Sequence, residues 1–133
     1  MAAQIPGSHK DLLDRPIVVT LATIMPDGTP QAHPVWFDYD GHYIRINTAS
    51  GRQKDENMME RPHVSVLSVD PDNPYRYLEV RGKIVERTEE GAVEHIESLS
   101  RRYTVNQYYK DGKPPAGETR VTYKIEPTRV LAR

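Results

Sequence analysis

The sequence predicts a mainly β protein, an antiparallel barrel of about six strands with flanking helices. Apolar segments rich in β-branched residues alternate with short turn signals along most of the chain. The one substantial helix comes late, so the strand–helix alternation that builds a parallel sheet is absent. The 133 residues suit a single domain, which we expect to extend over residues 1–133. Hairpin-linked strands that close on themselves fit these observations best.

The first part of the chain predicts a short helix and three strands. Ser8-His9-Lys10-Asp11 has the form of a capping box that opens a helix. Residues 17–25 are β-branched without a clean period, which predicts a strand buried on both faces. A turn follows, so residues 29–38 should form the hairpin partner, where Pro34 favours a sheet edge or a bulge. Residues 42–48 alternate in polarity and predict the third strand.

The remainder predicts two helices and three further strands. Residues 51–61 are polar and helical in character, and residues 63–69 form the fourth strand. Residues 75–87 predict a long strand in which Gly82 marks a bulge or a close backbone approach. Thr88 then caps a helix with an acidic first turn and one apolar face. A last short strand follows a loop rich in glycine and proline.

Composition excludes several classes of function. The 18 basic and 19 acidic residues leave a net charge of −1, without the basic bias expected of a nucleic-acid binder. The chain has no cysteine, and its histidines show no metal-ligand spacing, so we expect no metal site. Residues 17–25 form the longest nearly apolar run and are too few to cross a bilayer. With no signal-peptide pattern, we expect a cytoplasmic protein with no membrane partner.

The sharpest local signal is Asn47-Thr48-Ala49-Ser50-Gly51-Arg52-Gln53-Lys54, where a strand ends and a helix begins. Free N–H groups at a helix start favour an anion, whereas the macrodipole disfavours exposed cations there by about 0.3–1 kcal/mol each. Arg52 and Lys54 are placed against that preference, which suggests that an external anion such as phosphate holds them together. Thr48 and Ser50 would add hydroxyl donors to the same site.

An ordinary loop-to-helix junction is the alternative interpretation of this segment. Arg52 and Lys54 would then pair with Asp55, Glu56 or Asp11 on a solvated surface. Taken alone, such a segment is more often a junction of this kind than a phosphate site.

The second signal is Trp36-Phe37, which places the only Trp and the only Phe on one strand. Because side chains alternate along a strand, the two cannot face the same core. One of them would face a ligand or a second subunit. Alternatively, one fills the barrel and the other packs under a helix.

In order along the chain, these motifs resemble the pyridoxamine-phosphate-oxidase-like flavin-binding split barrels, over roughly residues 8 to 131. The matching segments are Pro34-Val35-Trp36-Phe37, Asp40-Gly41, Thr48 to Asn57, Arg61 to Val64, Asp70-Pro71, Tyr77 to Gly82, Leu99 to Tyr103 and Ile125 to Val130. No single motif is decisive, but the ordered set is fairly specific. Within that superfamily the chain is most similar to the short branch that uses the deazaflavin coenzyme F420.

The resemblance implies a six-stranded antiparallel split β-barrel that forms a homodimer, with the cofactor ring in a groove between subunits. In this family, the counterparts of Arg52 and Lys54 hold the cofactor's phosphate and acidic tail. Backbone groups of the strand Pro34-Val35-Trp36 would line the ring, and residues 75–77 would reach the site from the partner subunit. The implied cofactor-binding residues are Pro34, Val35, Trp36, Asn47, Thr48, Ser50, Arg52, Lys54, Tyr75, Arg76 and Tyr77.

The leading functional hypothesis is an F420-dependent reductase that transfers a hydride to a small unsaturated or conjugated molecule. Hydride transfer needs orientation and exclusion of water more than a dedicated protein acid, so the sequence names no catalytic residue. One alternative is an FMN-binding enzyme of the same fold. Among FMN-binding enzymes of this fold, a pyridoxamine-phosphate oxidase is less favoured, because the chain is short and lacks a C-terminal basic motif for a second phosphate. The other alternative is a carrier that binds F420 without turnover.

Overall fold

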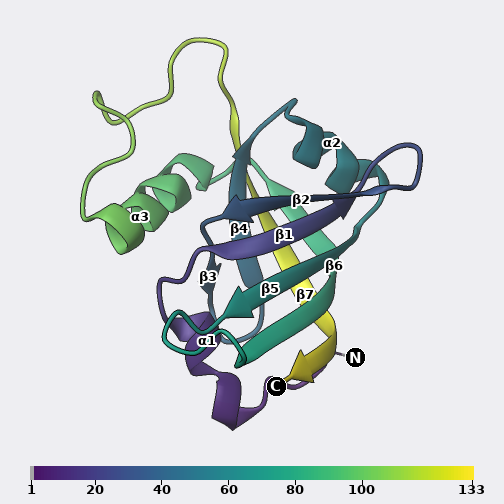
Figure 1. The fold of residues 1–133 in the computed structure, drawn as a ribbon. Coiled ribbons are helices and arrows are strands. Elements are labelled where there is room, and N and C mark those ends of the chain that lie inside the picture. The colour runs from purple at the N-terminus through teal and green to yellow at the C-terminus, as the bar shows by residue number, and fades with distance from the viewer. Residues whose placement is uncertain (1) are drawn as a thin grey trace.

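The computed structural model describes residues 2–133, which form one curled antiparallel sheet with helices around it (Figure 1). The strands lie in the order β2-β1-β5-β6-β7-β4-β3. They are β1 (Val19–Ile24), β2 (Pro30–Val35), β3 (Asp38–Tyr39), β4 (Ile44–Ala49), β5 (His63–Val69), β6 (Tyr77–Thr88) and β7 (Arg120–Ala132). The helices are η1 (Gly7–His9), α1 (Asp11–Asp14), α2 (Gln53–Glu60) and α3 (Ala92–Thr104). No helix among residues 2–133 is long and apolar enough to cross a membrane.

The mainly β barrel architecture is confirmed, but the described chain has seven strands where six were expected. The difference arises because residues 29–38 divide into β2 and the short β3. Between them, the N–H of Phe37 donates to the Tyr103 hydroxyl at 3.2 Å, and the Phe37 carbonyl accepts from Arg102 Nε at 3.1 Å. Side chains of α3 therefore take the backbone bonds that a continuous strand would give to a neighbour.

Within this chain strand β1 is buried on one face, whereas burial on both faces was predicted. Val19, Leu21 and Thr23 point into the barrel and are almost fully buried. Thr20 is exposed on the opposite face, and Val18, just before the strand, is 54% exposed. The front of β1, β5 and β6 in Figure 1 has no helix packed over it, which leaves that face open within this chain.

The two predicted helix caps are also wrong. The Ser8 hydroxyl bonds to the ring of His9, and α1 begins only at Asp11, after the short η1 turn. Thr88 is the last residue of β6, and its hydroxyl accepts the N–H of Glu90 in the turn that follows. Helix α3 begins after Gly91, which adopts a φ of 76°.

Pro34 and Gly82 lie where the sequence placed them. Strand β2, which contains Pro34, is at one edge of the sheet, where an absent N–H costs no ladder bond. At Gly82 the register between β6 and β7 shifts. A Cβ at this position would clash with Ile125 Cγ2 and lie 3.0 Å from the Glu126 carbonyl oxygen. The glycine is thus required by the close approach of β7.

The buried apolar side chains form two clusters. The larger fills the barrel and includes Phe37 and Tyr123, both fully buried. The smaller lies under α3 and contains Ile96 and Leu99, with Trp36 packed against it. The candidate site lies beside this smaller cluster.

Candidate functional site

A pocket of about 410 Å³ lies between α3, the start of α2 and strands β2, β4 and β7. It brings together Pro34, Val35, Trp36, Asn47, Arg52 and Lys54, which the sequence had assigned to one site although they lie up to twenty residues apart. The rest of its lining is Val18, Ile96, Leu99, Tyr108 and Arg120. The lining therefore combines three cations and an aromatic and apolar wall with no carboxylate.

Arg52 and Lys54 have no ion-pair partner within 4.0 Å among residues 2–133. The acidic groups proposed as their partners are engaged elsewhere or lie apart. Asp55 accepts from Arg87 Nε at 2.9 Å, and Asp11 accepts from Arg76 Nη2. The ion pairs that the surface-junction interpretation expected are therefore absent among residues 2–133.

The cations around the pocket lie close enough together to lower the pKa of Lys54. Burial lowers the pKa of Lys54, and the nearby charges of Arg52 and Arg120 lower it further. Like charges that destabilise one another in this way favour the arrival of an anion. The pocket is therefore suited to an acidic ligand even though the chain as a whole carries a net charge of −1.

The buried side chain of Asp55 holds the turn that carries these cations. This side chain is fully buried and accepts a hydrogen bond from the Gly51 N–H at 2.9 Å. Gly51 adopts a φ of 91°, a conformation that favours glycine, so the chain can turn sharply into α2. Arg52 then stands at the helix start with extended backbone. Asp55 and Gly51 thus place both cations at the pocket.

An aromatic wall faces the cations. The Trp36 indole stacks on Tyr103 with ring centroids 5.3 Å apart and an angle of 9° between planes. Tyr108 meets Trp36 edge-on at 6.2 Å. Phe37 fills the barrel while Trp36 packs under α3, as one interpretation of this pair held, and Trp36 also lines the pocket.

Tyr108 belongs to the loop after α3, which the carboxylate of Glu97 holds in place. The two carboxylate oxygens of Glu97 accept hydrogen bonds from the backbone N–H groups of Tyr108 and Tyr109, both at 2.9 Å. The bonds from Tyr109 and Tyr108 lower the pKa of Glu97. An ionised side chain on α3 therefore positions this part of the pocket wall.

The other predicted site residues do not line the pocket. Thr48 is fully buried, and Ser50 is exposed with its hydroxyl 3.3 Å from Arg87 Nη2. Arg76 pairs with Asp11 and Asp70, while Tyr75 and Tyr77 lie beside it at the start of β6. The expectation that residues 75–77 reach the site of a partner subunit concerns a second chain and stays a prediction.

Sequence reasoning missed five lining residues, which are Val18, Ile96, Leu99, Tyr108 and Arg120. Ile96 and Leu99 were visible only as the apolar face of a helix. Arg120 opens a strand on the far side of a loop and carries no local signal of a site. These residues reach the pocket through long-range packing, which spacing along the chain does not encode.

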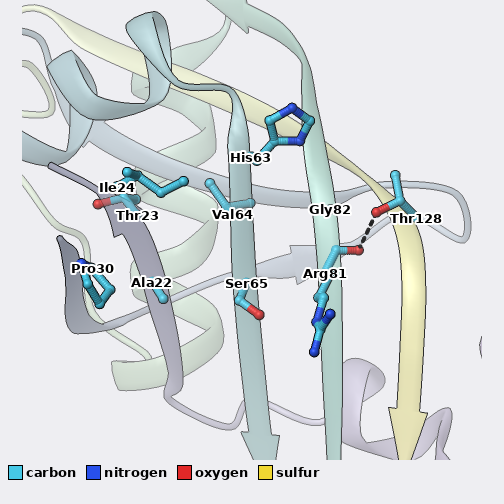
Figure 2. A pocket seen from close by; sticks show the side chains of 10 residues that line it. All are labelled: Ala22, Thr23, Ile24, Pro30, His63, Val64, Ser65, Arg81, Gly82 and Thr128. Carbon is cyan, nitrogen blue, oxygen red and sulfur yellow. Dashed lines mark hydrogen bonds between the residues drawn. The ribbon is translucent and has the colours of Figure 1, made fainter. Parts of the chain in front are cut away.

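A second hollow, of about 390 Å³, lies on the outer face of β1, β5 and β6. Figure 2 shows Ala22, Ser65 and Arg81 in a row across these three strands, with His63 above them. The Thr128 hydroxyl donates to the Arg81 carbonyl at 3.2 Å at one end. Small side chains rather than a cluster of charged groups form this hollow, and none of the predicted site residues lines it.

The fold is that of a split barrel with one cationic, aromatic-walled pocket, and comparison with known proteins agrees on the fold. The model of the pyridoxamine 5′-phosphate oxidase family matches residues 5–133, so the chain belongs to this family. The family predicted from the sequence is thereby confirmed.

Several solved structures are similar to this chain. A protein described as an F420 reductase is 38% identical, with a TM-score of 0.85 over 96% of this chain and 98% of that one. A conserved hypothetical protein from Mycobacterium tuberculosis is 29% identical, with a TM-score of 0.76 over 98% of this chain and 85% of that one. A heme storage protein from Vibrio cholerae is 14% identical, with a TM-score of 0.70 over 98% and 95%, and shares the fold alone. No curated protein matches the chain.

Proposed function

We propose that this protein is an F420-dependent oxidoreductase, a reductase of a small unsaturated or conjugated molecule. One observation carries the proposal, namely that Arg52 and Lys54, which have no ion-pair partner among residues 2–133, lie beside an aromatic wall in one pocket. A phosphate-bearing deazaflavin has an acidic tail for the cations and a flat ring for the wall. The likeness to an F420 reductase over almost the full length supports the same cofactor. FMN, which carries a single phosphate, is the alternative.

The roles of the residues follow from their positions. Arg52 and Lys54 would hold the cofactor's phosphate and acidic tail at the start of α2. Among residues 2–133 strand β2 pairs with β1 alone, so backbone groups on its other side are available to the edge of a ring. Trp36 and the apolar side chains of α3 would exclude water and fix the ring's orientation, as hydride transfer requires. The bound cofactor would supply the hydride.

We propose in addition that the protein works as a homodimer through the outer face of β1, β5 and β6. Leu67 lies on this face between Thr20 and Glu79, and Ala22 pairs with Ser65 in the adjacent row. Val18 and Leu131 are 54% and 39% exposed. These small and apolar side chains share the face with the Arg81–Glu79 ion pair, and no helix of residues 2–133 covers it (Figure 1). A second copy of the chain would cover this face.

Titration of the purified protein with F420 and, separately, FMN tests the cofactor assignment by fluorescence. Replacing both cations, Arg52→Ala with Lys54→Ala, should weaken F420 binding at least about 100-fold if each contributes about 1.5 kcal/mol. A matched control, Arg101→Ala with Lys113→Ala, removes the same charge from exposed positions outside the pocket and should leave the affinity within about twofold.

The outcomes separate the candidate functions. Tight F420 binding that only the pocket variant weakens supports the proposal, and turnover with a supply of reduced F420 then distinguishes a reductase from a carrier. Preference for FMN would assign the chain to the FMN-binding members of the fold. Binding of neither cofactor would contradict a redox function.

A further inference from the structure

Arg120 is the most deeply buried cation of the pocket. Its side chain is only 3% exposed, and its guanidinium carbon lies 5.4 Å from the centre of the Tyr108 ring. Nε donates to the side-chain oxygen of Asn47 at 2.8 Å. Nη1 has no hydrogen-bond partner among residues 2–133, although it is buried. A guanidinium has five N–H donors, so this arrangement leaves part of its binding capacity unused.

The nearest carboxylate does not satisfy Arg120. Glu118 Oε2 is 3.7 Å from Nη1, which is beyond hydrogen-bond length, and the same oxygen accepts from the Tyr109 hydroxyl. A buried charge whose counter-charge is not hydrogen-bonded to it destabilises the protein. The cost is offset when an anion enters the pocket and accepts from the terminal nitrogens.

Asn47 holds the guanidinium in a fixed orientation. The Asn47 side-chain nitrogen donates to the Ala92 carbonyl at 2.8 Å and lies 3.3 Å from the Thr122 hydroxyl. These contacts turn its side-chain oxygen toward Arg120. With Nε fixed on Asn47, the terminal nitrogens of Arg120 remain for a ligand.

We infer that Arg120 is an anion-binding residue of this pocket. Together with Arg52 and Lys54 it forms a site for a phosphate-class ligand that carries two or more negative charges. The inference deepens the proposed function and rests on the same pocket. It adds a residue that sequence reasoning did not assign, and it specifies the charge of the group that is bound.

Calorimetric titration with inorganic pyrophosphate tests the inference without the cofactor. Arg120→Met should lower the pyrophosphate affinity about 10- to 100-fold, because a hydrogen bond to a charged group is lost. Arg120→Lys keeps the charge but loses the planar fork, so it should restore only part of that affinity. The control Arg61→Met removes a half-buried arginine that donates to the Ile24 carbonyl outside the pocket. It should change the affinity less than about twofold.

A measurement on the unaltered protein covers the case in which Arg120→Met fails to fold. In an NMR spectrum of the arginine Nε–H groups, pyrophosphate should shift the Arg120 signal, which is assigned from its loss in Arg120→Lys. An unshifted signal at saturating pyrophosphate would overturn the inference. So would F420 binding that Arg120→Met leaves unchanged, although the proposed function would then stand. A pyrophosphate-induced shift without any F420 binding would support the inference and contradict the proposed function.

Discussion

At the scale of single residues, Asp55 determines a site that it does not line. It is fully buried, and its carboxylate accepts from Gly51, from Arg87 and from the Tyr123 hydroxyl. Each of these bonds joins a different part of the chain to the start of α2. The positions of Arg52 and Lys54 therefore depend on an acidic residue next to them in sequence that pairs with neither.

Asp55→Asn should lower the free energy of unfolding by about 2 kcal/mol at pH 7, since it leaves Arg87 without its charged partner. Burial alone would raise the pKa of Asp55, but hydrogen bonds from Arg87, Tyr123 and Gly51 outweigh it and lower the pKa. A lowered pKa contributes stability that is fully present above the unfolded value, about 3.9, and is lost as pH falls through the folded value. Urea unfolding across this range should show wild type and variant converging at low pH.

The exposed carboxylate of Asp111 provides the control for this experiment. Asp111→Asn should unfold as the wild type does at every pH. A difference between wild type and Asp55→Asn that stays constant with pH would contradict the role given to the ionised carboxylate.

At the scale of elements, the bulge in β6 depends on Gly82. Gly82→Ala would place a methyl group against the branched side chain of Ile125, which must shift, and against the Glu126 carbonyl oxygen, which must give way slightly. Overpacking of this kind should destabilise the protein by about 1–3 kcal/mol, measured as a lower melting temperature. Gly7→Ala is the control, because a Cβ there meets nothing within 4 Å. Equal melting temperatures for wild type and Gly82→Ala would show that the sheet can absorb the clash.

Elements were predictable from the sequence where their cause is local. Pro34 and Gly82 located an edge strand and a bulge because each changes the backbone at its own position. The division of one predicted strand after β2 was not predictable, since it depends on Arg102 and Tyr103 of α3. The same holds for the pocket. The basic turn of the pocket was predictable because it is a local sequence pattern. Arg120 was not, because it reaches the pocket through the pairing of β7 with β4.

At the scale of the whole molecule, the outer face of β1, β5 and β6 is the proposed dimer interface. Leu67→Glu would place a charge at the middle of this face, where burial without a partner is costly. We expect the variant to sediment as a monomer at concentrations where the wild type is a dimer. Lys113→Glu, on the exposed loop before β7, should leave the dimer intact. A monomeric wild type would contradict the proposal.

The bonds from Glu97 to the loop after α3 have a consequence for entry to the pocket. The amide groups of Tyr108 and Tyr109 depend on the two oxygens of one side chain. Among residues 2–133 neither amide N–H has another hydrogen-bond acceptor, so a rotation of that carboxylate would break both bonds at once. The Tyr109 side chain is held separately, by burial and by its hydroxyl bond to Glu118. Rotation of the Glu97 carboxylate would therefore loosen the backbone beside Tyr108 while Tyr109 still anchors the loop, so we expect local opening at Tyr108 rather than release of the whole loop.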